Sequence, residues 1–204
     1  MKHLILTIDT GTLDFNNLTK EALPIEYIAK VLANTYRFGG SSKISVLQHS
    51  INVVRLAAYG RGYSVELMTE YNYFSSELKA ALLHEISEAV GLGDIITPIK
   101  AFLGKKARKR INYIEEKLCE LYDVIYPFSS VVHRADRLAY VYEVETFLDK
   151  TTLNYTNHVK WSNITEGEIS YIEEYKRYCE ARGIVLYDEK SSINEFITLY
   201  NVLS

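Results

Sequence analysis

Apolar residues recur along most of the chain at the three- and four-residue spacing that is typical of amphipathic α-helices. Only three prolines interrupt this pattern. The spacing and the capping residues predict helices from Pro24 to about 38 and over 45–59, 76–91, 105–121, 129–148, 165–183 and 192–203. The sequence therefore predicts an all-α fold.

Two local patterns refine this prediction. Residues 4–14 alternate around a glycine, which favours a small N-terminal β-hairpin. Thr165 and Glu168 fit a capping box, and Gly183 is placed to take the left-handed conformation that ends many helices. No repeat or linker-like stretch divides the chain, so we expect residues 1–204 to form a single domain.

Composition and charge argue against several classes of protein. The chain has 204 residues, of which 48% are apolar, and can form a sizeable core without disulfides or structural metals. Its 23 Lys and Arg against 26 Asp and Glu give a net charge of −3, which disfavours binding to a nucleic acid polymer. The chain has two cysteines and no CxxC motif, which favours a reducing compartment. Asp9 interrupts the N-terminal apolar stretch before it reaches the length of a signal peptide, and no apolar run is long enough for a membrane helix. The sequence therefore predicts a cytoplasmic protein without a membrane span.

The most informative segment places ionisable residues on an apolar helix. His84, Glu85 and Glu88 follow the apolar run 81–83, and Asp94 comes after two glycines. On a continuous helix His84 and Glu88 share one face, and Glu85 lies about 100° round. Because a buried unpaired charge is costly, a metal ion or bound anion is the expected compensation. The alternative is a hydrogen-bonded core histidine beside exposed glutamates.

Two further residues of metal-ligand type lie on other predicted helices. His49 belongs to the apolar helix 45–59, and Asp136 lies in the first turns of the helix 129–148. Taken singly, His49 has an ordinary explanation as a hydrogen-bonded core histidine. Asp136 has one as an acid favoured by the positive end of its helix.

In combination, these residues resemble the metal-binding motif of the HD-domain phosphohydrolases, and within them the 5′-deoxynucleotidase-like group that bacteria and their phages encode. That family holds one divalent cation with a histidine, a helix-borne His-Asp pair and a later aspartate. The corresponding residues here are His49, His84-Glu85 and Asp136. The resemblance covers residues 5 to about 148 and implies an HD-domain helical bundle. Residues 150–204 match nothing that we can name, and we expect them to form a helical C-terminal extension.

Other segments extend the resemblance. Arg37-Phe38, followed by the SVLQHS segment at 45–50, is similar to the family's arginine plus aromatic pair and its Ser-Val-x-x-His-Ser segment. Glu88, Asp94 after Gly93, and Lys100 two residues after Pro98 are similar to the family's downstream glutamate, Gly-Asp and Pro-x-Lys. The resemblance implies that Arg37, Phe38 and Lys100 bind substrate and that Glu88 and Asp94 are candidates for general acid and base.

Two positions depart from the family pattern. Glu85 stands where the family has the shorter aspartate, which affects metal identity and rate more than metal binding itself. Asp94 follows His84 by ten residues, one more than the family pattern, so a one-residue bulge is expected between them.

Two competing motifs are incomplete. The zinc-peptidase helix His-Glu-x-x-His requires a second histidine where this chain has Glu88. A phosphate-binding loop ending in Gly-Lys requires a glycine five residues before Gly104, and that position is Ile99. A nucleotide would therefore be held by side chains and a metal.

The resemblance implies a metal-dependent phosphohydrolase that removes the 5′-phosphate of deoxynucleoside monophosphates, with Mn, Co, Zn or Mg as the candidate cation. One alternative is a deoxynucleoside triphosphate triphosphohydrolase. The basic run 105–110 would favour this activity if it faced the pocket, whereas its ordinary interpretation is a solvated helix face. A second alternative is a catalytically silent nucleotide-binding or sensor module, and a third is a helical protein without a ligand site. The expected partners are a small-molecule nucleotide and a second copy in a homodimer, with no membrane.

Overall fold

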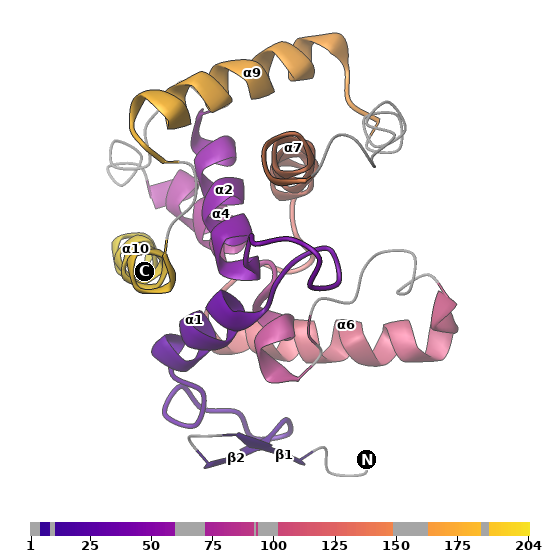
Figure 1. Ribbon diagram of the computed structural model, residues 1–204. Helices are drawn as coiled ribbons and strands as arrows, with labels where there is room; N and C mark the ends of the chain where they lie inside the picture. The colour runs from indigo at the N-terminus through magenta and orange to yellow at the C-terminus, as the bar shows by residue number, and fades with distance from the viewer. Residues whose placement is uncertain are drawn as a thin grey trace.

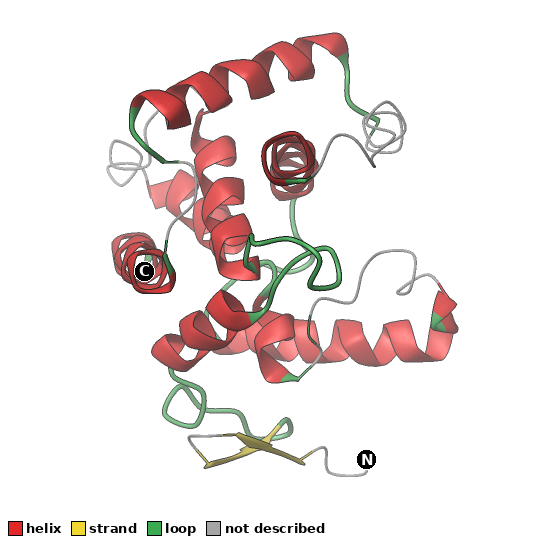
Figure 2. Cartoon of the chain, viewed as in Figure 1, coloured by secondary structure: helices red, strands yellow, loops and turns green. Residues whose placement is uncertain are grey.

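The computed structural model describes residues 5–8, 11–59, 72–91, 93, 102–148, 163–184 and 188–204. Its elements are β1 (Ile5–Ile8), β2 (Gly11–Asp14), α1 (Ile25–Asn34), α2 (Val46–Tyr59), α4 (Asn72–Leu83), the 3₁₀-helix η1 (Ile86–Val90), α6 (Gly104–Leu121), α7 (Ser130–Phe147), α9 (Glu166–Ala181) and α10 (Glu189–Leu203). Helices make up almost all of the regular structure that is described (Figure 2). The prediction of an all-α bundle with a small N-terminal hairpin is confirmed.

Helix α2 forms the centre of the bundle (Figure 1). It packs against α4 and α7, and α10 packs against α1, α2 and α4. Helix α9 lies against α7 on the side of the molecule away from the hairpin. Every residue of α2 except Arg55 and Tyr59 is buried, so polar side chains of this helix must find their partners inside the protein.

The hairpin has the predicted antiparallel pairing. Leu6 pairs with Leu13 and Ile8 with Gly11, which has a φ of 136° that favours glycine. Leu13 is fully buried and belongs to the main hydrophobic core, so this small sheet packs against the helices through its apolar face.

Capping residues lie at both predicted ends of α9. The Thr165–Glu168 capping box is present, and Gly183 has the left-handed φ of 66°. The last helix begins at Glu189, three residues before the predicted start. The Asp188 side chain accepts a hydrogen bond from the Ser191 N–H there and makes a favourable N-cap.

Helix α1 ends earlier than predicted. It stops at Asn34 instead of near residue 38, and Thr35 is extended. The chain then forms an isolated bridge between Tyr36 and Ser45, and the Arg37 N–H donates to the Ile44 carbonyl. This closed loop, which turns at Phe38 with a φ of 58°, brings Arg37 next to α2.

Helix α6 carries the basic run on its solvent side. Only Leu118 and Cys119 of this helix are buried, and its N-terminal half extends away from the other helices (Figure 1). The basic side chains Lys105, Lys106, Arg108, Lys109 and Arg110 are all exposed. Within the described ranges, no helix has both the length and the apolar character needed to cross a membrane.

Candidate metal centre

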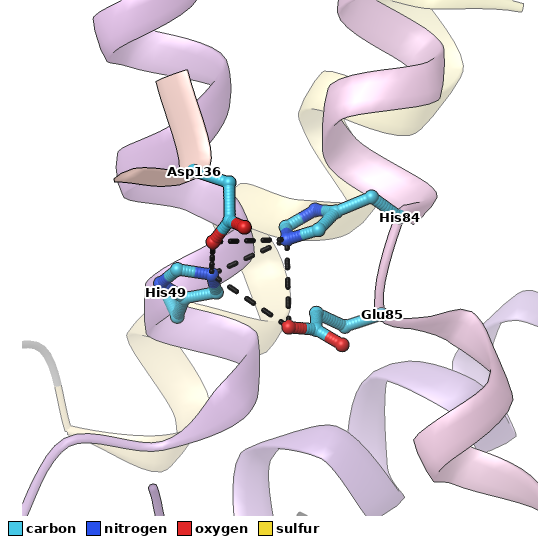
Figure 3. Close-up of side chains that lie close together, drawn as sticks. All are labelled: His49, His84, Glu85 and Asp136. Carbon is cyan, nitrogen blue, oxygen red and sulfur yellow. Dashed lines mark hydrogen bonds and ion pairs between the residues drawn. The ribbon is translucent and has the colours of Figure 1, made fainter. Parts of the chain in front are cut away.

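Four side chains from three parts of the bundle converge, the two histidines buried and the two acids partly exposed. His49 comes from α2, His84 and Glu85 directly follow α4, and Asp136 comes from α7 (Figure 3). One ligand atom from each of the four lies within 4.8 Å of the other three. The set comprises two imidazole nitrogens and two carboxylate oxygens, which are donors that divalent metal ions accept. The four residues could therefore hold a metal ion.

The distances within the cluster are short. His49 Nε2 lies 3.2 Å from His84 Nε2 and 3.1 Å from Asp136 Oδ1. Glu85 Oε1 lies 3.8 Å from His49 Nε2 and 3.6 Å from His84 Nε2. Figure 3 shows both rings and both carboxylates directed at the same region.

The other ring nitrogen of each histidine binds an acceptor outside the cluster. His84 Nδ1 lies 2.7 Å from the Ala81 carbonyl oxygen, which can only accept, so Nδ1 carries the hydrogen. His49 Nδ1 lies 2.9 Å from Glu143 Oε1. These contacts orient both rings so that their Nε2 atoms face each other. Metal-binding histidines commonly contact an acceptor through their other ring nitrogen in this way.

The helix containing this motif ends sooner than predicted. Helix α4 stops at Leu83, His84 and Glu85 form a turn, and Glu88 lies on η1, so the continuous helix expected over 76–91 is wrong at this end. The Ala81 carbonyl is the group that the Glu85 N–H would bind in a continuing α-helix, and the His84 ring uses that carbonyl. The turn allows the adjacent residues His84 and Glu85 to reach one centre.

Burial and charge set the protonation of the two histidines. Burial lowers the pKa of His49, but the Glu143 charge and hydrogen bonds to Asp136 and Glu143 outweigh it and raise the pKa to about 9. The pKa of His84 is lowered, mainly by burial. A proton on His49 Nε2 and a metal ion would therefore compete for the same position.

Both carboxylates of the cluster are held ionised. Partial burial raises the pKa of Asp136, but its hydrogen bond to His49 and the nearby positive charges place that pKa well below the usual value. Burial likewise raises the pKa of Glu85, and the charges of His84, His49 and Arg37 lower it further than burial raises it. The cluster thus supplies two negative charges, which fits a divalent cation.

Sequence reasoning missed Glu143, which lies two helical turns after Asp136. Its side chain is fully buried, and its Oε2 forms an ion pair with Arg37 Nε at 3.0 Å. Oε1 accepts from Asn52 Nδ2 at 3.1 Å and contacts His49. The seven-residue spacing from Asp136 was the available signal, because residues seven apart share one helix face.

The predicted substrate residues Arg37 and Phe38 lie beside the cluster. Arg37 Nη1 is 3.6 Å from Glu85 Oε1, and the Arg37 guanidinium carbon is 5.6 Å from the centre of the Phe38 ring. The Phe38 ring in turn packs against Tyr140, with ring centres 5.9 Å apart. Tyr140 lies one turn after Asp136, so this aromatic pair borders the metal-ligand cluster.

The remaining predicted site residues have different outcomes. Glu88 is 4% exposed and lies on η1, where its N–H donates to the Glu85 carbonyl. It is not among the four clustered residues. Asp94 and Lys100 lie outside the residues that the structure describes.

No family model matches this chain, and no curated protein matches it.

Proposed function

We propose that this protein is a metal-dependent phosphohydrolase that removes the 5′-phosphate of deoxynucleoside monophosphates. The observation that carries the proposal is the cluster of His49, His84, Glu85 and Asp136, in which both rings are held from outside so that their Nε2 atoms converge. A divalent cation bound there would supply Lewis acidity, which lowers the pKa of water and screens the charge of a phosphate.

Arg37 supports phosphate as the group that is recognised. Its guanidinium lies at the edge of the cluster, next to Glu85, and a planar guanidinium matches the oxygens of a phosphate in a bidentate way. Because an arginine is not deprotonated at neutral pH, it provides a permanent positive charge for an anionic substrate.

The aromatic pair supports a nucleotide rather than inorganic phosphate alone. Phe38 lies next to Arg37 in sequence and packs against Tyr140, so a phosphate on Arg37 would place the attached nucleoside near aromatic faces. Base and sugar rings stack favourably on such faces. The sequence resemblance further assigns proton transfer to Glu88 and Asp94 and substrate binding to Lys100.

The test is a turnover screen of the purified protein. Deoxy- and ribonucleotides in mono- and triphosphate form are each supplied with Mn²⁺, Co²⁺, Zn²⁺ or Mg²⁺, and phosphate and triphosphate release are measured separately. We expect phosphate from deoxynucleoside monophosphates and its loss in His84→Ala. The control His133→Ala removes an exposed histidine of α7 and is expected to keep full activity. Full activity in His84→Ala contradicts the proposal, and triphosphate release would assign the triphosphohydrolase activity instead.

A nucleotide-binding module without turnover is the second candidate. Glu85 favours it, because this residue stands in the cluster where the family that the sequence resembles has the shorter aspartate, and the change affects rate more than metal binding. Such a protein would gain thermal stability from a deoxynucleotide and release no phosphate with any of the four metals. Turnover with any one of them excludes it.

A further inference from the structure

Glu143 is a buried carboxylate with an unusual set of partners. The side chain has no exposed surface, and removing a carboxylate from water is costly unless charges and hydrogen bonds compensate it. Its two oxygens lie within 3.1 Å of three nitrogen atoms, Nε of Arg37, Nδ1 of His49 and Nδ2 of Asn52. These contacts compensate the burial of the carboxylate.

The two oxygens of this carboxylate serve two different parts of the site. Oε1 lies 2.9 Å from Nδ1 of His49, a residue of α2 whose other nitrogen points into the metal-ligand cluster. Oε2 lies 3.0 Å from Nε of Arg37, which belongs to the loop between α1 and α2. One side chain of α7 thus joins the cluster to the arginine beside it.

We propose that Glu143 is a positioning residue that couples metal binding to phosphate binding. The inference rests on the proposed function and deepens it, because it assigns one residue the task of orienting both a metal ligand and the phosphate-binding arginine. Glu143 is not one of the four clustered residues, and the proposal assigns it no contact with the substrate.

The effect on His49 follows from the hydrogen bond to Nδ1. An acceptor at Nδ1 holds the hydrogen there, keeps the ring from rotating and increases the basicity of Nε2. Loss of such an outer partner typically weakens metal binding about 10–100-fold.

Glu143 orients the Arg37 side chain because it pairs with the Nε atom of the guanidinium. The ion pair uses Nε, and Nη1 lies 3.6 Å from Glu85 Oε1, so the outer end of the guanidinium is turned toward the cluster. Arg37 lies on a loop rather than a helix, and a buried negative charge at Nε restricts the many rotamers that this long side chain would otherwise sample.

The structure also offers a matched pair without this role. Arg55, on the same helix as His49, pairs with Glu195 of α10, and both side chains are largely buried. A Glu195→Gln variant removes a carboxylate from an arginine pair in the same bundle without touching the four clustered residues. It separates a general loss of stability from a specific effect on the site.

The experiment compares Glu143→Gln and Glu143→Asp with Glu195→Gln in the full chain. Mn²⁺ affinity is measured by calorimetry on metal-stripped protein, and kcat and KM are measured with the best deoxynucleotide. In Glu143→Gln we expect about tenfold weaker Mn²⁺ binding and about tenfold higher KM, because a neutral amide cannot satisfy both partners. In Glu195→Gln we expect both quantities within about threefold of the wild type.

A double-mutant cycle tests the link to Arg37. If Glu143 raises phosphate affinity through Arg37, the double variant Arg37→Lys/Glu143→Gln should have nearly the same KM as Arg37→Lys alone. The double variant should still bind Mn²⁺ more weakly than Arg37→Lys. Thermal unfolding confirms that each variant is folded, and Glu143→Asp, which keeps the charge, is expected to recover part of both affinities.

The outcomes distinguish this inference from the proposed function. A folded Glu143→Gln protein with wild-type Mn²⁺ affinity and KM overturns the inference while turnover by the wild type stands. A wild type that binds Mn²⁺ without turnover overturns the proposed function. In that case calorimetry with inorganic phosphate on the Mn²⁺-loaded protein replaces KM, and unchanged phosphate and Mn²⁺ binding in Glu143→Gln overturns the inference.

Discussion

His49 Nε2 and His84 Nε2 lie 3.2 Å apart, although His49 belongs to α2 and His84 to the turn that follows α4. Each ring is held at its Nδ1 by an acceptor outside the pair. Without a proton or a cation between them, the two Nε2 lone pairs would repel each other. The arrangement therefore favours binding of a positive species at this position, and this relationship underlies the predictions that follow.

Metal binding should stabilise the folded protein. A ligand that binds only the folded state at about 100 times its Kd adds roughly 2.7 kcal/mol to the free energy of unfolding. We expect Mn²⁺ or Co²⁺ to raise the Tm of chelator-treated protein by several degrees, measured by differential scanning calorimetry. The increase should disappear in His84→Ala and persist in His133→Ala. An equal increase in His84→Ala would mean that the metal binds elsewhere.

The metal-stripped protein should lose stability as the pH rises above neutrality. The pKa of His49 is raised from 6.5 to about 9, so the folded state binds this proton more tightly than the unfolded state. The contribution is complete below pH 6.5 and is lost as the pH rises through about 9. We expect a decrease of about 1–3 kcal/mol in the free energy of unfolding across that window, measured by urea denaturation with chelator present.

A variant isolates the His49 contribution to this pH dependence. His49→Gln removes the titrating group, so the decrease between these pH values should flatten, whereas His133→Ala should retain it. A pH profile that is unchanged in His49→Gln would assign the effect to other groups.

The length and the charge of Glu85 should have separate effects. Glu85→Gln removes one of two negative charges from the cluster, and we expect Mn²⁺ affinity to fall at least about tenfold. Glu85→Asp keeps the charge but retracts the carboxylate by one methylene, so we expect it to bind metal with an altered preference among Mn²⁺, Co²⁺ and Zn²⁺. Calorimetric titration with each metal measures both effects. Unchanged Mn²⁺ affinity in Glu85→Gln would show that the charge of Glu85 does not control binding.

The capping box at the start of α9 should contribute measurably to the stability of the fold. Thr165 accepts from the Glu168 N–H, and the Glu168 side chain accepts from the Thr165 N–H. Thr165→Ala removes one of these bonds and should lower the free energy of unfolding by about 1 kcal/mol without changing Mn²⁺ affinity. Urea denaturation tests the first effect and calorimetry the second. Ser170→Ala, an exposed change on the same helix, is the control.

The local pattern of the chain predicted much of the fold. Helices α2 and α7 lie within one residue of the expected limits, because apolar residues recur at helical spacing along each segment. Caps such as Ser129 and Thr165 act within four residues, so a short segment contains the whole signal. The turn at His84 was missed because it depends on a side-chain bond to the Ala81 carbonyl, which competes with the helical pattern.

The sequence by itself determined which side chains of metal-ligand type exist, and it placed His49 and Asp136 on the correct helices. Only the tertiary structure decided that His49, His84, Glu85 and Asp136 meet, and that Glu143, 94 residues from His49, supports them. Periodicity defines which residues share a face of one helix. The packing of the helices against one another determines which faces come together, and that depends on contacts between residues far apart in the chain.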